Sequence, residues 1–107
     1  MSDEVVVVAI ATAREGTADQ AEELLRAVIP PTHAEDGCIT YALHRDASDP
    51  HRFVLIERWS SREALDRHLA SDHIAAFAAG LGEVRGAPSQ VLFLEPVPIG
   101  DPGKGVL

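Results

Sequence analysis

The sequence predicts a single α+β domain in which strands and helices alternate along the chain. Short runs rich in β-branched and aromatic residues alternate with longer stretches in which apolar residues recur every three or four positions. The chain has 107 residues, which is enough for one compact core and too few for two. Apolar residues make up 46% of the chain and charged residues 24%, which indicates an ordinary globular domain.

The charge of the chain argues against two classes of partner. The formal net charge is −8, which repels nucleic acids and anionic membranes, so we expect neither as a partner. The single cysteine, Cys38, cannot form an intrachain disulfide. The acidic start, Met1 to Glu4, does not match the basic start of a signal peptide. Both observations lead us to expect a cytoplasmic protein.

The first part of the chain predicts a strand followed by a helix. Residues 5–13 are apolar on both alternating faces, the pattern of a strand that is covered on both sides. Thr17 and Gln20 form a capping box, so we expect Thr17 to be the N-cap of an amphipathic helix. Pro30 and Pro31 lack an N–H and crowd the preceding turn, so the helix should kink or end there.

The rest of the chain predicts a hairpin, two helices and a last strand. Residues 38–45 and 52–59 are expected to be strands joined by turn residues. A capping box beginning at Ser60 predicts one helix, Ser71 predicts a second, and residues 90–95 form the fourth strand. The order β-α-β-β-α-β is that of the ferredoxin-like fold, in which helices cover one face of a four-stranded antiparallel sheet.

Both faces of this sheet are predicted to be apolar. All four residues from Phe53 to Ile56 are apolar, although successive residues of a strand point to opposite faces. Soluble monomers rarely expose such a patch, so we expect a homodimer in which two sheets face each other. The alternative is a monomer in which the Pro- and Gly-rich C-terminal tail, residues 98–107, folds over the second face of the domain formed by residues 1–97.

Three segments carry a resemblance to a known family: AEDGCITY at 34–41, RFVLIERWSSREAL at 52–65 and HLASDH at 68–73. With them the chain resembles the antibiotic biosynthesis monooxygenase family, including its quinol-oxidising members. The resemblance implies a dimeric α+β barrel of ferredoxin-like subunits, with a pocket between sheet and helices and often no metal or flavin. Members oxidise phenolic or quinol substrates with oxygen, degrade haem, or isomerise small phosphorylated carbonyl compounds.

Glu57 is the first candidate for a catalytic residue. Strand alternation places it on the same face as Leu55 and Trp59, and a carboxylate among apolar residues needs a partner or a raised pKa. Glu57 could then act as a base or orient a histidine. The alternative is a structural carboxylate that is bonded to the backbone or to an arginine.

Two histidines are the other catalytic candidates. His73 lies near the start of a helix, where the positive end of the helix dipole disfavours imidazolium and leaves a neutral ring that can accept a phenolic proton. His68 lies at the edge of an apolar helix face. For each of them the alternative is an interfacial or partly exposed histidine.

Three further residues are expected to bind the substrate. Trp59 could stack on an aromatic ring, and Leu55 shares its strand face. Phe77 lies four residues after His73, on the same helix face. The alternative for Trp59 is packing in the core or at an interface.

The motifs of metal and cofactor sites are absent from the sequence. His68 and His73 are five residues apart, which does not place two ligands on one face of a helix. HxxxH, HExxH, a cysteine pair, a P-loop and a dinucleotide-binding glycine fingerprint are all missing. The sequence therefore predicts a protein without a metal, flavin or haem.

These observations favour a cofactor-free monooxygenase that oxidises a phenolic or quinol-type small aromatic substrate with O2. A histidine, oriented by Glu57, would remove a phenolic proton, and the phenolate would pass an electron to oxygen. Two alternatives remain open. One is an isomerase of a small carbonyl compound that uses the same residues, and the other is a non-catalytic dimer that binds an apolar ligand or has a structural role.

Overall fold

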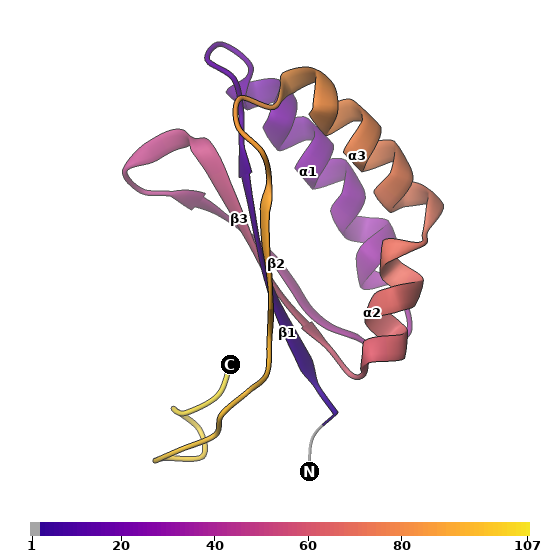
Figure 1. Ribbon diagram of the computed structural model, residues 1–107, viewed down its shortest axis with the longest axis vertical. Helices are drawn as coiled ribbons and strands as arrows, with labels where there is room; N and C mark the ends of the chain where they lie inside the picture. The colour runs from indigo at the N-terminus through magenta and orange to yellow at the C-terminus, as the bar shows by residue number, and fades with distance from the viewer. Residues whose placement is uncertain (1–2) are drawn as a thin grey trace.

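A computed structural model describes residues 3–107, so Met1 and Ser2, the first residues of the acidic start, lie outside the described part (Figure 1). The order of elements is the predicted one, with the second helical region divided in two. The elements are β1 (Val5–Thr12), α1 (Ala18–His33), β2 (Cys38–Asp46), β3 (Asp49–Trp59), α2 (Arg62–Leu69), α3 (Asp72–Val84) and β4 (Gln90–Leu94).

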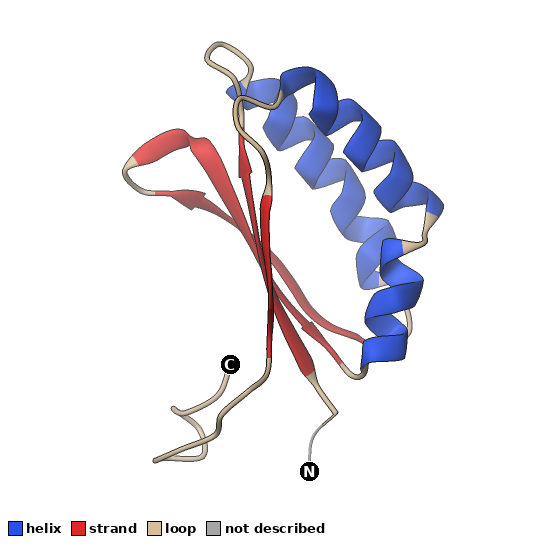
Figure 2. Ribbon diagram, in the orientation of Figure 1, coloured by secondary structure: helices blue, strands red, loops and turns tan. Residues whose placement is uncertain are grey.

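The four strands form one antiparallel sheet in the order β2-β3-β1-β4. In the central pair, Val5 lies opposite Trp59 and Val7 opposite Glu57. All three helices lie on the same side of the sheet (Figure 2). This is the ferredoxin-like arrangement, and the predicted fold class is confirmed.

A β-bulge changes the face on which β2 presents its first residue. The register shifts between Cys38 and Thr40, so that Cys38 pairs with Trp59 and Tyr41 pairs with Glu57. Simple alternation would put Cys38 and Tyr41 on opposite faces of the sheet, whereas the extra residue lets both face the helices. Tyr41 is consequently buried beside Trp59.

Two of the predicted helix starts are wrong in detail. The Thr17 hydroxyl does not accept a bond from the first turn of α1; it donates to the backbone carbonyls of Arg14 and Val84, so it joins the start of α1 to the end of α3. Helix α2 begins one residue later than expected, with Ser61 in place of Ser60 as the residue whose side chain accepts a backbone N–H.

Other parts of the helix prediction hold or differ at the ends. The Ser71 side chain accepts the backbone N–H of Ile74 and caps α3, as expected. Helix α1 does not end at Pro30 and Pro31 but continues to His33. The two prolines lie in its last turn, and each lacks the N–H that would bond the carbonyl four residues earlier. The backbone N–H of Ala34 donates to the Pro30 carbonyl at 3.2 Å and closes this turn.

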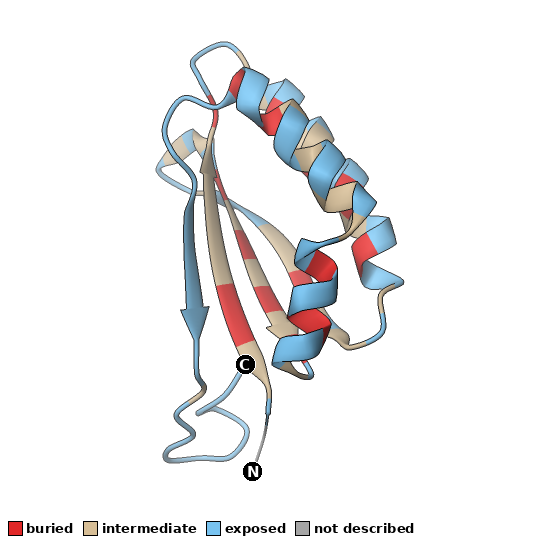
Figure 3. Ribbon diagram, turned by 45° about the vertical axis from the view of Figure 1, so that its right-hand side comes forward, coloured by how far each residue is buried: buried red, intermediate tan, exposed pale blue. Residues whose placement is uncertain are grey.

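The core lies between the sheet and the helices, and Trp59 is at its centre. Its side chain is fully buried (0% exposed), and its indole N–H donates to Glu57 Oε1 at 3.0 Å. Figure 3 shows that the buried positions of the strands and helices face one another across this layer. Besides Trp59, the largest fully buried side chains among the described residues are Phe53, Leu25, Leu65, His68 and Thr32.

The opposite face of the sheet carries no helix (Figure 2). Strand β4 is exposed along its length (Figure 3), and the exposed fraction of Leu92 on this face is 55%. The apolar residues that share this open face with Leu92 on the neighbouring strands include Val8, Ile10, Val54 and Ile56, and Arg58 lies on the same face.

The C-terminal tail, residues 98–107, contains hydrogen bonds of its own. It turns back at Asp101, which accepts two backbone N–H groups on its side chain. Val106 and Leu107 then line a cavity of about 300 Å³ together with Val6 and Leu94. The tail lies beyond the end of β4, at one end of the sheet (Figure 1). Among the described residues no helix is long and apolar enough to cross a membrane.

We predict that Trp59→Ala lowers the free energy of unfolding by about 3–5 kcal/mol. The substitution leaves a large cavity and removes the indole N–H that donates a hydrogen bond to Glu57. Urea denaturation followed by far-UV circular dichroism measures the loss, since Trp59 is the only tryptophan. A loss below about 1 kcal/mol would contradict the assignment of Trp59 to the core.

Candidate active site

One carboxylate and two histidines meet at the helix-covered side of the sheet. His68 Nδ1 lies 2.7 Å from Glu35 Oε2, and His73 Nε2 lies 2.9 Å from the same oxygen atom. A carboxylate oxygen only accepts hydrogen bonds, so each of these two ring nitrogens carries the hydrogen. His68 is therefore the Nδ1–H tautomer and His73 the Nε2–H tautomer when the rings are neutral.

The break between α2 and α3 brings the two histidines together. In one continuous helix, residues five apart would point in directions about 140° apart. Here α2 ends at Leu69 and α3 begins at Asp72, and Ser71 joins them by donating its hydroxyl to the His68 carbonyl at 2.7 Å. The spacing argument against a shared site was therefore wrong, because the two rings belong to different helices.

The turn between α1 and β2 places Glu35. Gly37 has φ +87°, a conformation that side chains disfavour, and a Cβ atom there would lie 2.5 Å from Ala64 Cβ in α2. The Gly37 carbonyl also accepts the backbone N–H of Ser60 at 2.8 Å. The turn is thus held closely against the start of α2, which fixes Glu35 beside His68.

His68 is enclosed by aromatic rings. Its exposed fraction is 2%, and the ring centroid lies 4.5 Å from that of Trp59 and 5.3 Å from that of Tyr41. Burial lowers the pKa of His68, although the hydrogen bond to Glu35 opposes this effect. The ring is accordingly neutral at pH 7, and its Nε2 hydrogen-bonds to none of the described residues.

His73 is the accessible member of the group. Its side chain is 24% exposed and lines a cavity of about 180 Å³ between α1 and α3. Its Nδ1 hydrogen-bonds to no described residue. The other residues around this cavity are Phe77, Ala76, Leu24, Ala27 and Val28, so the walls are apolar.

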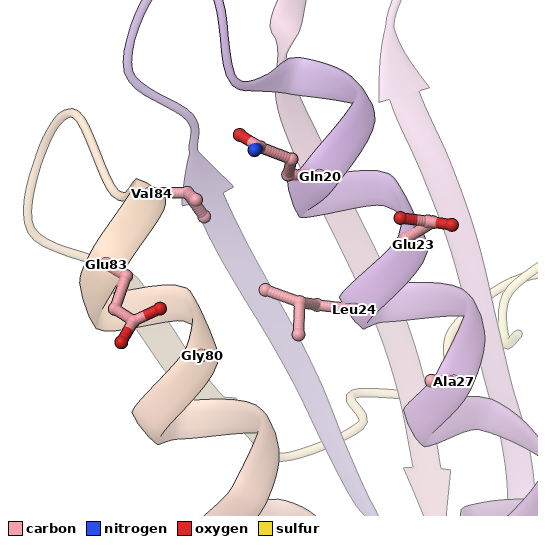
Figure 4. A pocket seen from close by; sticks show the side chains of 7 residues that line it. All are labelled: Gln20, Glu23, Leu24, Ala27, Gly80, Glu83 and Val84. Atoms are coloured by element: carbon pink, nitrogen blue, oxygen red, sulfur yellow. The ribbon is translucent and has the colours of Figure 1, made fainter.

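A second cavity, of about 480 Å³, continues the groove between the two helices. Leu24 and Ala27 line both cavities, and Figure 4 shows Leu24 pointing from α1 toward α3. Glu23 and Glu83 line this larger cavity, so its lining carries acidic groups. The walls of the smaller cavity beside His73 are apolar.

Glu57 does not orient a histidine. Its carboxylate accepts the Trp59 indole N–H, and the carboxylate that orients both histidines is Glu35. Burial raises the pKa of Glu57 to about 7, although the hydrogen bond from Trp59 opposes the shift. Leu55 lies two residues earlier on the same face and is buried in the core.

The structure therefore brings together five of the six predicted site residues and separates one. His68, His73, Trp59 and Glu57 form a connected group, Phe77 lines the cavity beside His73, and Leu55 packs in the core. Sequence reasoning missed Glu35 as a site residue. The signal available for it was its position in the 34–41 segment, two residues before a glycine in a turn.

We predict that Glu57→Gln stabilises the protein more at pH 8 than at pH 5. A raised carboxyl pKa means that the folded state holds a proton that the unfolded state has lost, so stability falls as the pH rises from about 4.5 through 7. The amide of Glu57→Gln does not titrate. The free energy of unfolding of the variant relative to that of the natural protein should therefore rise by roughly 2–3 kcal/mol between pH 5 and pH 8. Urea denaturation at fixed protein concentration measures it.

Glu15→Gln, in an exposed loop, controls for the loss of one surface carboxylate. A difference between Glu57→Gln and the natural protein that is equal at both pH values would contradict the raised pKa of Glu57.

Several known proteins are similar to this chain in sequence and in architecture. Rv0793 from Mycobacterium tuberculosis is 40% identical over 97 residues, which cover 91% of this chain and 95% of the relative. Its structure has a TM-score of 0.85. PA3566 from Pseudomonas aeruginosa is 35% identical, with a TM-score of 0.84 over 91% of this chain and 97% of that one.

A more distant structure has the same fold. SnoaB from Streptomyces nogalater, a cofactor-independent oxygenase, has a TM-score of 0.78 at 21% identity, over 88% of this chain and 93% of its own. The family model for antibiotic biosynthesis monooxygenases matches residues 4–80. The chain therefore belongs to the antibiotic biosynthesis monooxygenase family.

Proposed function

We propose that this protein is a monooxygenase that oxidises a small phenolic or quinol-type aromatic compound with O2. The observation that carries the proposal is the Glu35 carboxylate, which accepts from both His68 and His73 and leaves a ring nitrogen of His73 unbonded beside an apolar cavity. Membership of the monooxygenase family supports the same reaction class.

In this proposal His73 is the general base. Glu35 holds the Nε2–H side of the ring, so Nδ1 carries the lone pair that accepts the phenolic proton. His68 shares the carboxylate oxygen and keeps Glu35 in place.

The cavity beside His73 suits one aromatic ring. Its volume of about 180 Å³ is that of a small site, and its walls are apolar apart from His73. Phe77 comes from the same helix and offers an aromatic contact, while Leu24 and Val28 approach from α1. An apolar site also dissolves O2 and keeps water from the reacting carbon atom.

The proposed reaction needs no electron carrier, because all electrons come from the substrate. His73 removes a hydroxyl proton from the quinol, and the resulting anion passes one electron to O2. The two radicals combine at a ring carbon, the O–O bond breaks, one oxygen atom stays on the ring and the other leaves as water. In balance, one hydroquinone and one O2 give one hydroxybenzoquinone and one water.

The working unit that we propose is a homodimer. The open face of the sheet carries Val8, Ile10, Val54, Ile56 and Leu92, and the tail reaches only one end of it. A second copy, sheet against sheet, would cover the apolar side chains of both.

We predict that the protein consumes O2 with at least one member of a panel of hydroquinones, and that His73→Ala lowers kcat by roughly 10²–10⁴-fold. Glu35→Gln should also lower kcat, because a neutral amide oxygen accepts more weakly from the two rings than a charged carboxylate oxygen does and cannot stabilise a protonated His73. An oxygen electrode measures the rate, and ¹⁸O2 should place one labelled atom in the product.

His51→Ala is the matched control, since His51 lies at the hairpin and its ring pairs with Asp49 at 3.5 Å. Product formation that continues without O2 would favour an isomerase. Saturable binding of a quinol without any turnover would favour a ligand-binding protein, and either result would contradict the proposal.

We predict that light scattering at micromolar concentration gives twice the chain mass of 11.4 kDa. Ile56→Glu places a charge at the centre of the open face and should convert the protein to a monomer. Leu69→Glu, on the exposed end of α2, is the control and should leave the dimer intact. A monomer mass for the natural chain would contradict the proposed dimer.

A further inference from the structure

Two imidazole nitrogens in this protein point at one place. His68 Nδ1 and His73 Nε2 lie 2.7 and 2.9 Å from the same oxygen of Glu35, and the three ligand atoms all lie within 4.8 Å of one another. A neutral imidazole can carry its hydrogen on either ring nitrogen. If each ring moves its hydrogen to the other nitrogen, the two nitrogens that now donate to Glu35 will each present a lone pair in the same direction, toward one point.

This set of three donors is one that transition metals prefer. Two imidazole nitrogens and one carboxylate oxygen bind Zn²⁺ in catalytic sites and Fe²⁺ in facial triads. Ligand atoms around a tetrahedral zinc ion lie about 3.4 Å apart, given metal–ligand distances near 2.1 Å. The separations of 2.7 and 2.9 Å are shorter than this by about 0.7 and 0.5 Å. A small outward movement of the Glu35 side chain would admit the ion.

The surroundings of the three ligands suit a metal site. The rings of Trp59 and Tyr41 lock the orientation of His68, and the tight turn at Gly37 fixes the backbone beside Glu35. The side chains of His73 and Glu35 are 24% and 16% exposed, so a water molecule or an added ligand can reach a fourth position of the ion from the solvent.

We propose that Glu35, His68 and His73 form a binding site for one divalent transition-metal ion, with Zn²⁺ or Co²⁺ as suitable occupants. Each neutral ring would bind the ion through the nitrogen that now donates to Glu35, and its proton would move to the other ring nitrogen. The metal-bound state and the hydrogen-bonded state therefore exclude each other. In the metal-bound state His73 has no free lone pair at the cavity, so the ion would inhibit the oxidation that we propose.

The test uses the metal alone, without any substrate. The protein is treated with a chelator, dialysed and titrated with Zn²⁺ in a calorimeter, and with Co²⁺ while the visible spectrum is recorded. We expect one ion per chain and the intense visible bands of a Co²⁺ ion with few ligands. His73→Ala and Glu35→Gln should each weaken binding by roughly 100-fold or more, because each removes one of three ligands.

His51→Ala is again the matched control, and it should bind the metal as the natural protein does, because His51 lies at the hairpin. His73 is partly exposed, so its variant is expected to fold, and circular dichroism checks this. Absence of saturable binding, or binding that survives both His73→Ala and Glu35→Gln, would overturn the proposal. Binding without quinol turnover would support the metal site and contradict only the proposed oxidation.

Discussion

Burying a polar ring costs free energy unless the ring forms a hydrogen bond inside the protein. His68 is such a ring, because it is almost inaccessible to water. Its side-chain partner among the described residues is Glu35, 33 positions earlier in the chain. The same oxygen atom accepts from His73, so one carboxylate holds the turn after α1, the last part of α2 and the first turn of α3. The geometry of the candidate site depends on this shared oxygen more than on any other contact.

The buried polar groups near it divide into two sets with different chemistry. Glu57 and Trp59 satisfy each other within the core, where burial holds the carboxyl pKa near 7. Glu35 and the histidines lie nearer the surface and reach the groove between α1 and α3 through His73. The contact of Trp59 with the His68 ring connects the two sets, so the core and the site support one another.

The periodicity of the sequence was sufficient for the fold, because each amphipathic segment had one face to bury. The details that failed depend on distant contacts: Thr17 bonds to the end of α3 instead of capping α1, and α1 continues through Pro30 and Pro31. The site was harder still. Both histidines were identified, but their convergence needs the helix break at Ser71, and Glu35 arrives from a turn whose position is set by Gly37 and Ala64. A local sequence pattern does not predict contacts of this kind between segments that are distant in the chain.

The shared carboxylate can be examined directly by long-range ¹H–¹⁵N NMR of the histidine rings at pH 8. The described geometry requires opposite tautomers: hydrogen on Nδ1 of His68 and hydrogen on Nε2 of His73. Assignment by His68 and His73 substitution identifies the two signals, and Glu35→Gln should disturb both of them while leaving the His51 signals unchanged. The same tautomer on both rings, or a Glu35→Gln spectrum in which neither ring changes, would contradict the account.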